Sequence, residues 1–372
     1  MADYRVISSD NHIYEPADLW TSRIESKYKD RCPQLMPFQD GQVWVCDGRR
    51  GQGLAQGTNP GRRFEDPETI IRLDVFENVR PGGYDPDEHV KDMDIDGVDV
   101  SIIYPTVGLL LFGTVPDSDL LTAIFKTYND FTAEFCNAHP KRLKGIAMVN
   151  IDDVQEGISE LERARKLGFV GAMITVYPPE GRRYNSPEYE PLWAAAESLE
   201  MPLGMHAATN RVGSGEGFQG PETSRRAITA NMDHWVRMSL ADLIYSGVFE
   251  RYPKLLVGAV EHELSWIPHF LDRIDFNYTQ RGIGPDDYRF KEDMIPSDYF
   301  HRNVFAGFQE DALGVRDRHI IGVDLLQWGA DYPHVETTFP RSREILEEIL
   351  ADCTDEEKSK IAGGNAARVY KV

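Results

Sequence analysis

The stretch FVGAMITV at residues 169–176 is an almost unbroken apolar run, and a helical pattern at residues 154–167 precedes it. Gly168 lies between the two segments and is a typical end for a helix, because glycine readily adopts the left-handed conformation that closes one. Strands of a parallel sheet are buried on both faces, so they read as continuous apolar runs. The pattern predicts a helix followed by a strand of a buried parallel sheet.

The same alternation of helix and strand continues in both directions along the chain. Seven further runs rich in Val and Ile are predicted strands, at residues 5–9, 98–104, 143–151, 202–206, 255–260, 304–308 and 325–329. Helices are predicted between them at residues 120–138, 154–167, 191–199, 227–245, 264–276 and 342–350. A doubly wound open sheet has the same local pattern, but a count of eight strands favours a (β/α)₈ TIM-type barrel.

Two segments are longer than a simple crossover connection. We expect one domain over residues 1–372, with residues 16–92 as an insertion between strands one and two and residues 208–226 as a loop after strand five. Long connections often cover a functional site, and an ordinary surface excursion is the alternative. We expect both segments to lie over the C-terminal mouth of the barrel, with substrate entering beneath them.

Composition narrows the range of partners and locations. The chain has 372 residues, with 40 Lys and Arg against 61 Asp and Glu, for a net charge of −21. This balance argues against nucleic acid and against an anionic membrane surface as partners. The four cysteines show no Cys-x-x-Cys spacing, which indicates free thiols, and the first residues do not resemble a signal peptide. We therefore expect a cytoplasmic protein that acts on a small molecule, and homodimer formation stays open.

Candidate ligands for a metal follow four of the predicted strands. In a barrel the C-terminal ends of the strands converge on one face, where active sites lie. The residues at these ends are Asp10 and His12, His206, Glu261 and His262, and Asp331. Each has an ordinary alternative as a turn, cap or hydrogen-bonded residue, but their coincidence at one face favours a metal centre. Carboxylates and imidazoles without cysteine indicate Zn²⁺, Mn²⁺ or Fe²⁺, as one ion or two.

The sixth strand offers two neighbouring candidates. Adjacent residues of a strand point to opposite sides, so only one of Glu261 and His262 can face the barrel axis directly. We favour Glu261, as a fifth ligand or a bridge to a second ion. His262 is then a candidate acid or base.

Three motifs carry a resemblance to a known family. They are SDNHIYEP at residues 9–16, GMH at residues 204–206 and WGADYPH at residues 328–334. With them the chain resembles the amidohydrolase superfamily, in the amidohydrolase-2 branch that includes aminocarboxymuconate-semialdehyde and resorcylate decarboxylases. The resemblance implies a (β/α)₈ barrel that holds one or two divalent metals through strands one, five and eight. By position, these ligands are Asp10, His12, His206 and Asp331.

The chain also departs from the pattern of that family. Strand one has Asp10-x-His12 where His-x-His is usual, which still supplies two ligands. The predicted fourth strand contains no lysine, so the carbamylated lysine that bridges two metals in many members is absent. Glu261 is then the carboxylate best placed to bridge two ions.

Two kinds of enzyme fit this set of residues. The first is a metal-dependent hydrolase or non-oxidative decarboxylase of a small organic acid or cyclic compound. Asp331 would move the proton in hydrolysis, and Asp331 or His262 would protonate the ring carbon in decarboxylation. The alternative is a non-haem diiron monooxygenase, of which the superfamily contains an example in diterpenoid biosynthesis, with Glu15 or His334 completing the ligands. A binding protein without catalysis is the least favoured class.

The remaining site predictions concern the substrate. We expect Tyr177, Trp266 and His334 to contact it in a pocket with mixed aromatic and polar walls. Four arginines of the insertion could bind a carboxylate, although solvated loop positions are commoner for such residues; they are Arg49, Arg50, Arg62 and Arg63.

Overall fold

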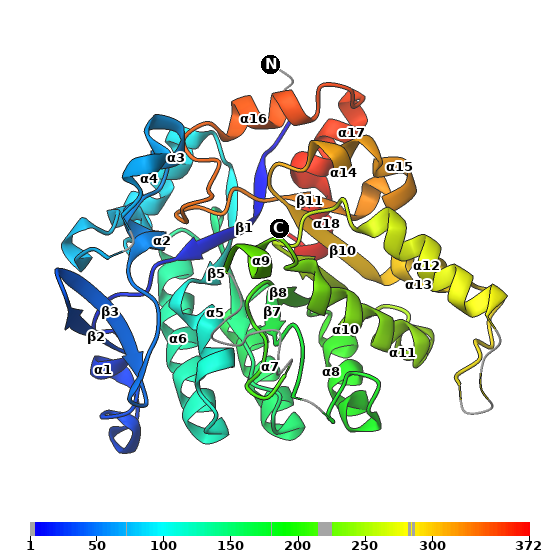
Figure 1. The fold of residues 1–372 in the computed structure, drawn as a ribbon, viewed down its shortest axis with the longest axis horizontal. Helices are drawn as coiled ribbons and strands as arrows, with labels where there is room; N and C mark the ends of the chain where they lie inside the picture. The colour runs from blue at the N-terminus through cyan, green and yellow to red at the C-terminus, as the bar shows by residue number, and fades with distance from the viewer. Residues whose placement is uncertain (1–3, 72, 180, 215–224, 282–283, 285–286) are drawn as a thin grey trace.

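Eight parallel strands form the centre of the molecule in the computed structural model, which describes residues 4–71, 73–179, 181–214, 225–281, 284 and 287–372. In this sheet β1 pairs with β5, and each later strand pairs with the next in chain order up to β11 (Figure 1). The eight predicted strands are all present, so the predicted (β/α)₈ barrel is confirmed. They are β1 (Ile7–Ile13), β5 (Val100–Pro105), β6 (Leu143–Met148), β7 (Gly171–Ile174), β8 (Leu203–His206), β9 (Val257–Val260), β10 (Val304–Phe308) and β11 (Leu326–Trp328).

Helices surround these strands (Figure 1). They are α1 (Leu19–Arg23), α2 (Ala55–Thr58), α3 (Arg62–Glu65), α4 (Pro86–Asp96), α5 (Val107–Thr114), α6 (Ser118–Ala138), α7 (Val154–Leu167), α8 (Glu190–Leu199), α9 (Arg225–Thr229), α10 (Asp233–Tyr245), α11 (Val248–Arg251), α12 (Ile267–Gln280), α13 (Pro296–Asn303), α14 (Ala312–Arg316), α15 (Arg318–Ile321), α16 (Ser342–Ile349), α17 (Asp355–Ser359) and α18 (Asn365–Tyr370). Among the described helices, none combines the length and the apolar character that crossing a membrane would require.

One predicted helix is divided in two. We expected a single helix at residues 227–245, but α9 ends at Thr229 and α10 begins at Asp233. Between them the backbone N–H of Asn231 donates to Ile228, and that of Met232 donates to Thr229. These i to i−3 bonds tighten the chain into a turn that interrupts the predicted helix.

Backbone hydrogen bonds join the first strand to the chain just after the last. The N–H of Asp331 donates to the carbonyl of Asp10 at 2.8 Å, and the N–H of His12 donates to the carbonyl of Tyr332 at 2.6 Å. We call these contacts between β1 and residues 330–332 the closing seam. It contains three of the predicted metal ligands, so closing the barrel also assembles part of the site.

A bulge in β1 lies at the same place. Ser8 pairs with Ser101 and Asn11 pairs with Ile103, so Ser9 and Asp10 stand opposite a single residue of β5. Bulges of this kind bend a strand and change the direction of a side chain, and they are frequent next to active sites.

The insertion after β1 contains a small sheet that the sequence analysis did not predict. Strands β2 (Gln34–Phe38), β3 (Gly41–Cys46) and β4 (Arg49–Arg50) are antiparallel. Asp47 and Gly48 connect β3 to β4 with φ of 51° and 71°, the left-handed values of a type I′ hairpin turn. The Asp-Gly pair was therefore the available signal. Figure 1 shows this sheet at the edge of the barrel.

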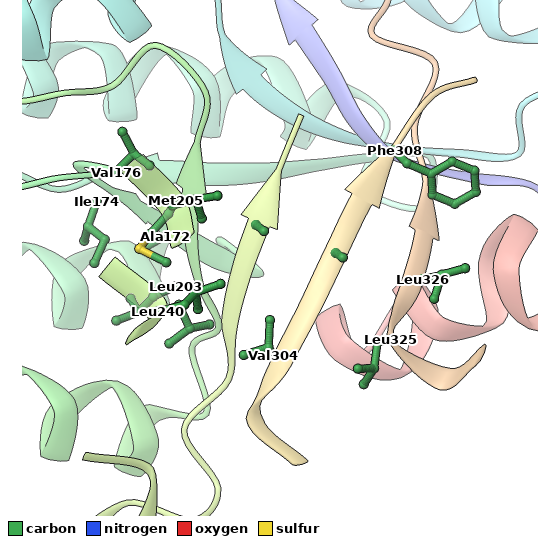
Figure 2. Close-up of a cluster of buried hydrophobic side chains, with 14 of the residues drawn as sticks. Ala172, Ile174, Val176, Leu203, Met205, Leu240, Val304, Phe308, Leu325 and Leu326 are labelled. Atoms are coloured by element: carbon green, nitrogen blue, oxygen red, sulfur yellow. The ribbon is translucent and has the colours of Figure 1, made fainter. Parts of the chain in front are cut away.

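Buried apolar side chains hold the strands against the helices. Figure 2 shows part of this core, where Leu203 and Met205 of β8 lie near Leu240 of α10. Val304 at the start of β10 and Leu326 of β11 belong to the same cluster. This packing keeps the strand ends that carry the site in fixed positions.

Replacing Asn11 by alanine should weaken the closing seam. Its side chain is buried, and its Oδ1 accepts from the N–H of Tyr332 at 3.1 Å and from the hydroxyl of Ser8 at 2.9 Å. Buried groups that lose their partners each cost about 1–3 kcal/mol, so Asn11→Ala should lower the free energy of unfolding by about 3 kcal/mol. Urea denaturation followed by circular dichroism measures this change. Asn137→Ala, on the exposed surface of α6, is the control and should change it by less than about 0.5 kcal/mol; equal losses would contradict the prediction.

Candidate metal centre

Four of the predicted ligands come together at the mouth of the barrel. Asp10, His12 and His206 offer ligand atoms that lie within 4.8 Å of one another, and so do His12, Asp331 and His334. Asp10 and His12 lie on β1, His206 is the last residue of β8, and Asp331 follows β11 through the closing seam. The structure thus groups Asp10, His12, His206 and Asp331, and it adds His334, which we had expected to contact substrate.

The imidazole of His12 is oriented as a metal ligand. Its Nδ1 lies 2.7 Å from the carbonyl of Pro105, which can only accept, so Nδ1 carries a proton and Nε2 is the ring nitrogen that faces the cluster. Nε2 lies 3.3 Å from Asp10 Oδ1 and 3.0 Å from Asp331 Oδ1. Neither contact has the direction of a hydrogen bond, and Nε2 and both carboxylate oxygens of Asp331 are buried without such a partner in the described part of the chain. The atoms converge on a shared point, as the ligands of a cation do.

The charges of the site also fit a cation. Burial would raise the pKa of Asp331, but His334 and His12 lower it to about 2, and His206 and His12 likewise lower the pKa of Asp10. For Glu261, burial and then the charges of Asp331 and Asp10 raise the pKa well above its usual value. The buried carboxylates of Asp10 and Asp331, with the partly exposed Glu261 beside them, form a set whose negative charge a divalent ion would balance.

Glu261 faces the cluster, as we had favoured. Its Oε2 lies 3.4 Å from His206 Nδ1, and it lines the cavity described below. Glu261 and Asp331 have φ of 59° and 54°, a left-handed conformation that costs a residue other than glycine about 1–2 kcal/mol. This conformation turns each side chain toward the metal centre at the point where its strand ends. The role of Glu261 as a fifth metal ligand or as a bridge between two ions stays a prediction.

Two further predicted residues do not line the cavity described below, and the roles predicted for them stay predictions. His262, a candidate acid or base, is buried with Nε2 3.3 Å from the carbonyl of Met205, and it does not line the cavity. Because Glu261 takes the inward position, its neighbour turns away. Trp266, a candidate substrate contact, donates from Nε1 to the carbonyl of Glu263 at 3.0 Å and packs on Phe270 at the start of α12. It does not line the cavity either.

A cavity of about 520 Å³ opens onto the metal centre. We call it the metal cavity. Glu261 and His334 lie at its metal end, and residues 207–210, 228–235 and 51–56 contribute to its walls. Side chains from both predicted cover segments therefore line it, while residues 215–224 of the second segment lie outside the described part of the chain. The lining residues are Gly51, Gln52, Gln56, Thr106, Leu109, Leu110, Gly113, Thr114, Val176, Ala207, Ala208, Asn210, Ile228, Thr229, Asn231, Met232, Trp235, Glu261, His334 and Glu336.

The sequence analysis missed several lining residues. Trp235 contributes the aromatic wall, whereas Tyr177 packs behind it with ring centroids 4.7 Å apart and does not line the cavity. Trp235 has the spacing of a helical core residue, so periodicity alone could not show that it faces a cavity. The side-chain nitrogens of Asn210 and Gln52 are buried without a hydrogen-bond partner among the described residues. Both can donate to a bound molecule.

Glu15, which the diiron alternative could have used as a ligand, has a different role. Its carboxylate accepts from the backbone N–H groups of Val107 at 2.8 Å and Gly108 at 3.0 Å, at the start of α5. It satisfies the free amides of a helix N-terminus and fixes α5 beside β1. The structure gives no sign that it takes part in the metal centre.

The fold and the site together define a metal-dependent enzyme on an amidohydrolase-type barrel. The model of the amidohydrolase family matches residues 71–372, and the chain belongs to this family, in the amidohydrolase-2 branch. The class predicted from the sequence, a metal-dependent hydrolase or non-oxidative decarboxylase, is confirmed at that level. Its cofactor is a divalent metal.

Three proteins illustrate the relationship. A gamma-resorcylate decarboxylase of Polaromonas sp. is 26% identical over 304 residues, covering 77% of this chain and 87% of that protein. An amidohydrolase from Mycobacterium avium subsp. paratuberculosis K-10 has a TM-score of 0.82 with 22% identity, over 100% of this chain and 99% of its own. A dihydroxybenzoic acid decarboxylase of Polaromonas sp., solved with bound manganese, has a TM-score of 0.66 with 19% identity, over 99% and 97%. These proteins give no support to the diiron alternative.

Removing His206 should remove the metal. Its Nε2 lies 3.3 Å from Asp10 Oδ1, and alanine leaves that corner of the site without a ligand. Purified without chelator, His206→Ala should hold less than about a tenth of the wild-type metal by plasma mass spectrometry. The control His139→Ala removes a partly exposed imidazole that pairs with Asp87 and should keep full metal. Full occupancy in His206→Ala would contradict the assignment.

Proposed function

We propose that this enzyme catalyses the non-oxidative decarboxylation of an aromatic acid with an oxygen substituent beside its carboxylate. The observation that carries the proposal is the metal cavity, whose apolar walls lead to a floor of carboxylates and imidazoles. No lysine or arginine lines it among the described residues, so a substrate carboxylate finds compensating charge only at the metal. The relatives named as resorcylate and dihydroxybenzoic acid decarboxylases support this chemistry.

The walls of the metal cavity suit a planar ring. Leu109, Met232 and Trp235 offer apolar and aromatic surface, and a flat ring buries its faces against such side chains. The free amide of Asn210 would donate to a ring oxygen, which fixes the ring against rotation. Apolar walls with a few directed polar groups are typical of a site for a small ligand.

The reaction requires the carbon–carbon bond to the carboxylate to break and the ring carbon to gain a proton. When bound, the metal supplies the positive charge that holds the carboxylate and its neighbouring oxygen. The electron pair of the broken bond stays on the ring carbon, CO₂ leaves, and Asp331 delivers a proton to that carbon. Asp331 is suited to this step because its low pKa keeps the buried carboxylate ionised, so that it can take a proton from His334, whose Nδ1 lies 2.7 Å from its Oδ1, and pass that proton to the ring carbon.

A short chain of side chains can return the proton to Asp331. His334 Nδ1 lies 2.7 Å from Asp331 Oδ1, and His334 Nε2 lies 2.9 Å from the hydroxyl of Thr106. His334 also stacks on His12 with ring centroids 3.8 Å apart, which holds its ring in place. Because His334 and Thr106 both line the metal cavity, a proton can pass from the cavity to Asp331 along this route.

The finer predictions about location and assembly remain part of this proposal. We infer that the enzyme acts in the cytoplasm, supported by four cysteines that are all buried and free. A homodimer stays a prediction, which light scattering of the purified protein would test.

Asp331→Asn should abolish turnover while the protein stays folded. The amide keeps the size of the side chain but cannot carry the proton, and such a loss lowers a rate by about 10²–10⁴-fold. The assay is release of CO₂ from a 2-hydroxybenzoate in D₂O, with mass spectrometry of the product for one deuterium on the ring. His262→Asn is the matched control, since His262 does not line the metal cavity, and it should keep kcat within about threefold. Loss of turnover in His262→Asn with activity in Asp331→Asn would reverse the assignment.

A further inference from the structure

A second cavity of about 710 Å³ adjoins the metal cavity. We call it the outer cavity. Gly51, Gln52, Gln56 and Glu336 line both cavities, so the two meet at these residues. The other walls of the outer cavity come mainly from the insertion after β1. They are Phe38, Gln39, Val43, Arg50, Gly53, Ala55, Ile70, Leu73 and Val335.

We propose that the outer cavity is a subsite for a substituent of the substrate, an uncharged chain that ends in an anionic group. This inference rests on the proposed function, because the metal cavity must hold the reacting ring. An uncharged chain suits this cavity because its walls present apolar surface, from Phe38, Val43, Ile70 and Leu73. With the metal and the reacting ring in the metal cavity, the chain would reach the outer cavity past the residues that line both.

Arg50 provides the reason for the anionic end. It is exposed, lies 4.6 Å over the ring of Phe38 and has no hydrogen bond or ion pair among the described residues. Three neighbouring arginines of the insertion are occupied by Thr114, by Thr69, and by Thr337 and Glu310; they are Arg49, Arg62 and Arg63. Stacking on Phe38 fixes the plane of the Arg50 guanidinium, which leaves its N–H groups for a carboxylate.

The junction gives the order of groups along the ligand. Glu336 lies there, so the part of the ligand that passes it should carry no negative charge. Gln52 lies at the same junction, and its buried Nε2 has no partner among the described residues, so it can donate to an oxygen of the chain. Gln56 is held by the N–H of Val335, which donates to its Oε1 at 2.9 Å. The ligand thus has its reacting carboxylate at the metal, a neutral middle and a second anion at Arg50.

The test compares three probes on the metal-loaded enzyme by calorimetry. They are salicylate, salicylate with a hexyl chain para to its carboxylate, and the same chain ending in a carboxylate. We expect the hexyl chain to improve binding about tenfold and the terminal carboxylate to add about threefold. Equal affinity for all three probes would overturn the proposal.

Two variants place the effect in the outer cavity. Ala55→Trp puts a large side chain into its wall and should remove the advantage of both chains while changing salicylate less than about twofold. Arg50→Gln should remove only the gain from the terminal carboxylate, and its neighbour Arg49→Gln, which bonds to Thr114 instead, should keep that gain. An unchanged chain advantage in Ala55→Trp would overturn the subsite.

Failure of the proposed function has a different signature. If salicylates bind and the chain advantage maps to Ala55 and Arg50, but no CO₂ is released from any 2-hydroxybenzoate, decarboxylation is wrong and the subsite stands. If CO₂ is released at equal kcat/KM from the short and the long probes, decarboxylation stands and the subsite is wrong.

Discussion

The hydrogen bond from the backbone of Asp331 to the carbonyl of Asp10 is the constraint on which the site depends. It joins the first strand to the chain after the last, and both residues that it links carry a carboxylate into the metal centre. The neighbouring bond from His12 to Tyr332 brings a third candidate ligand to the same short stretch of backbone. A barrel that closes at this seam therefore has most of its metal centre already formed. His206 completes the group because it is the last residue of β8.

Such an arrangement concentrates charge that the fold alone does not balance. Asp10 and Asp331 are buried beside the partly exposed Glu261, whose pKa is raised first by loss of solvent and then by the charges of Asp331 and Asp10. Left-handed backbone at Glu261 and Asp331 adds conformational cost at the same place. The favourable free energy of packing the strands behind the site can offset these costs, because the seam and the core fix the backbone on both sides. Binding of a cation would offset these costs, because its binding free energy stabilises the folded protein.

The sequence could predict the strands and the ligands for one physical reason. Most of the buried parallel strands are apolar along their length, so polar residues at or just after their ends mark the mouth of the barrel, as His206 and Asp331 do. What escaped prediction depends on local backbone or on direction. Glu261 was favoured over His262 from strand alternation alone, and the left-handed φ that it adopts was not indicated by the sequence. Trp235 has an apolar spacing that a core and a cavity wall share, and Trp266 faces Phe270 although it closely follows Glu261. The small sheet of the insertion was signalled only by Asp47-Gly48.

The insertion connects the chemistry of the barrel to its selectivity. Barrel strands fix the metal ligands and can vary little, whereas residues 51–56 lie on a connection that contributes to both cavities at once. A change in this connection can alter which substituent is accepted without moving Asp10, His12, His206 or Asp331. Charged side chains also differ between the two cavities. The metal end is rich in carboxylates, and among the described lining residues the one cationic side chain is Arg50, in the outer cavity. An acid that carries a second anion would meet positive charge at both ends and pass a neutral or hydrogen-bonding middle, which links recognition by the insertion to the reaction at the closing seam.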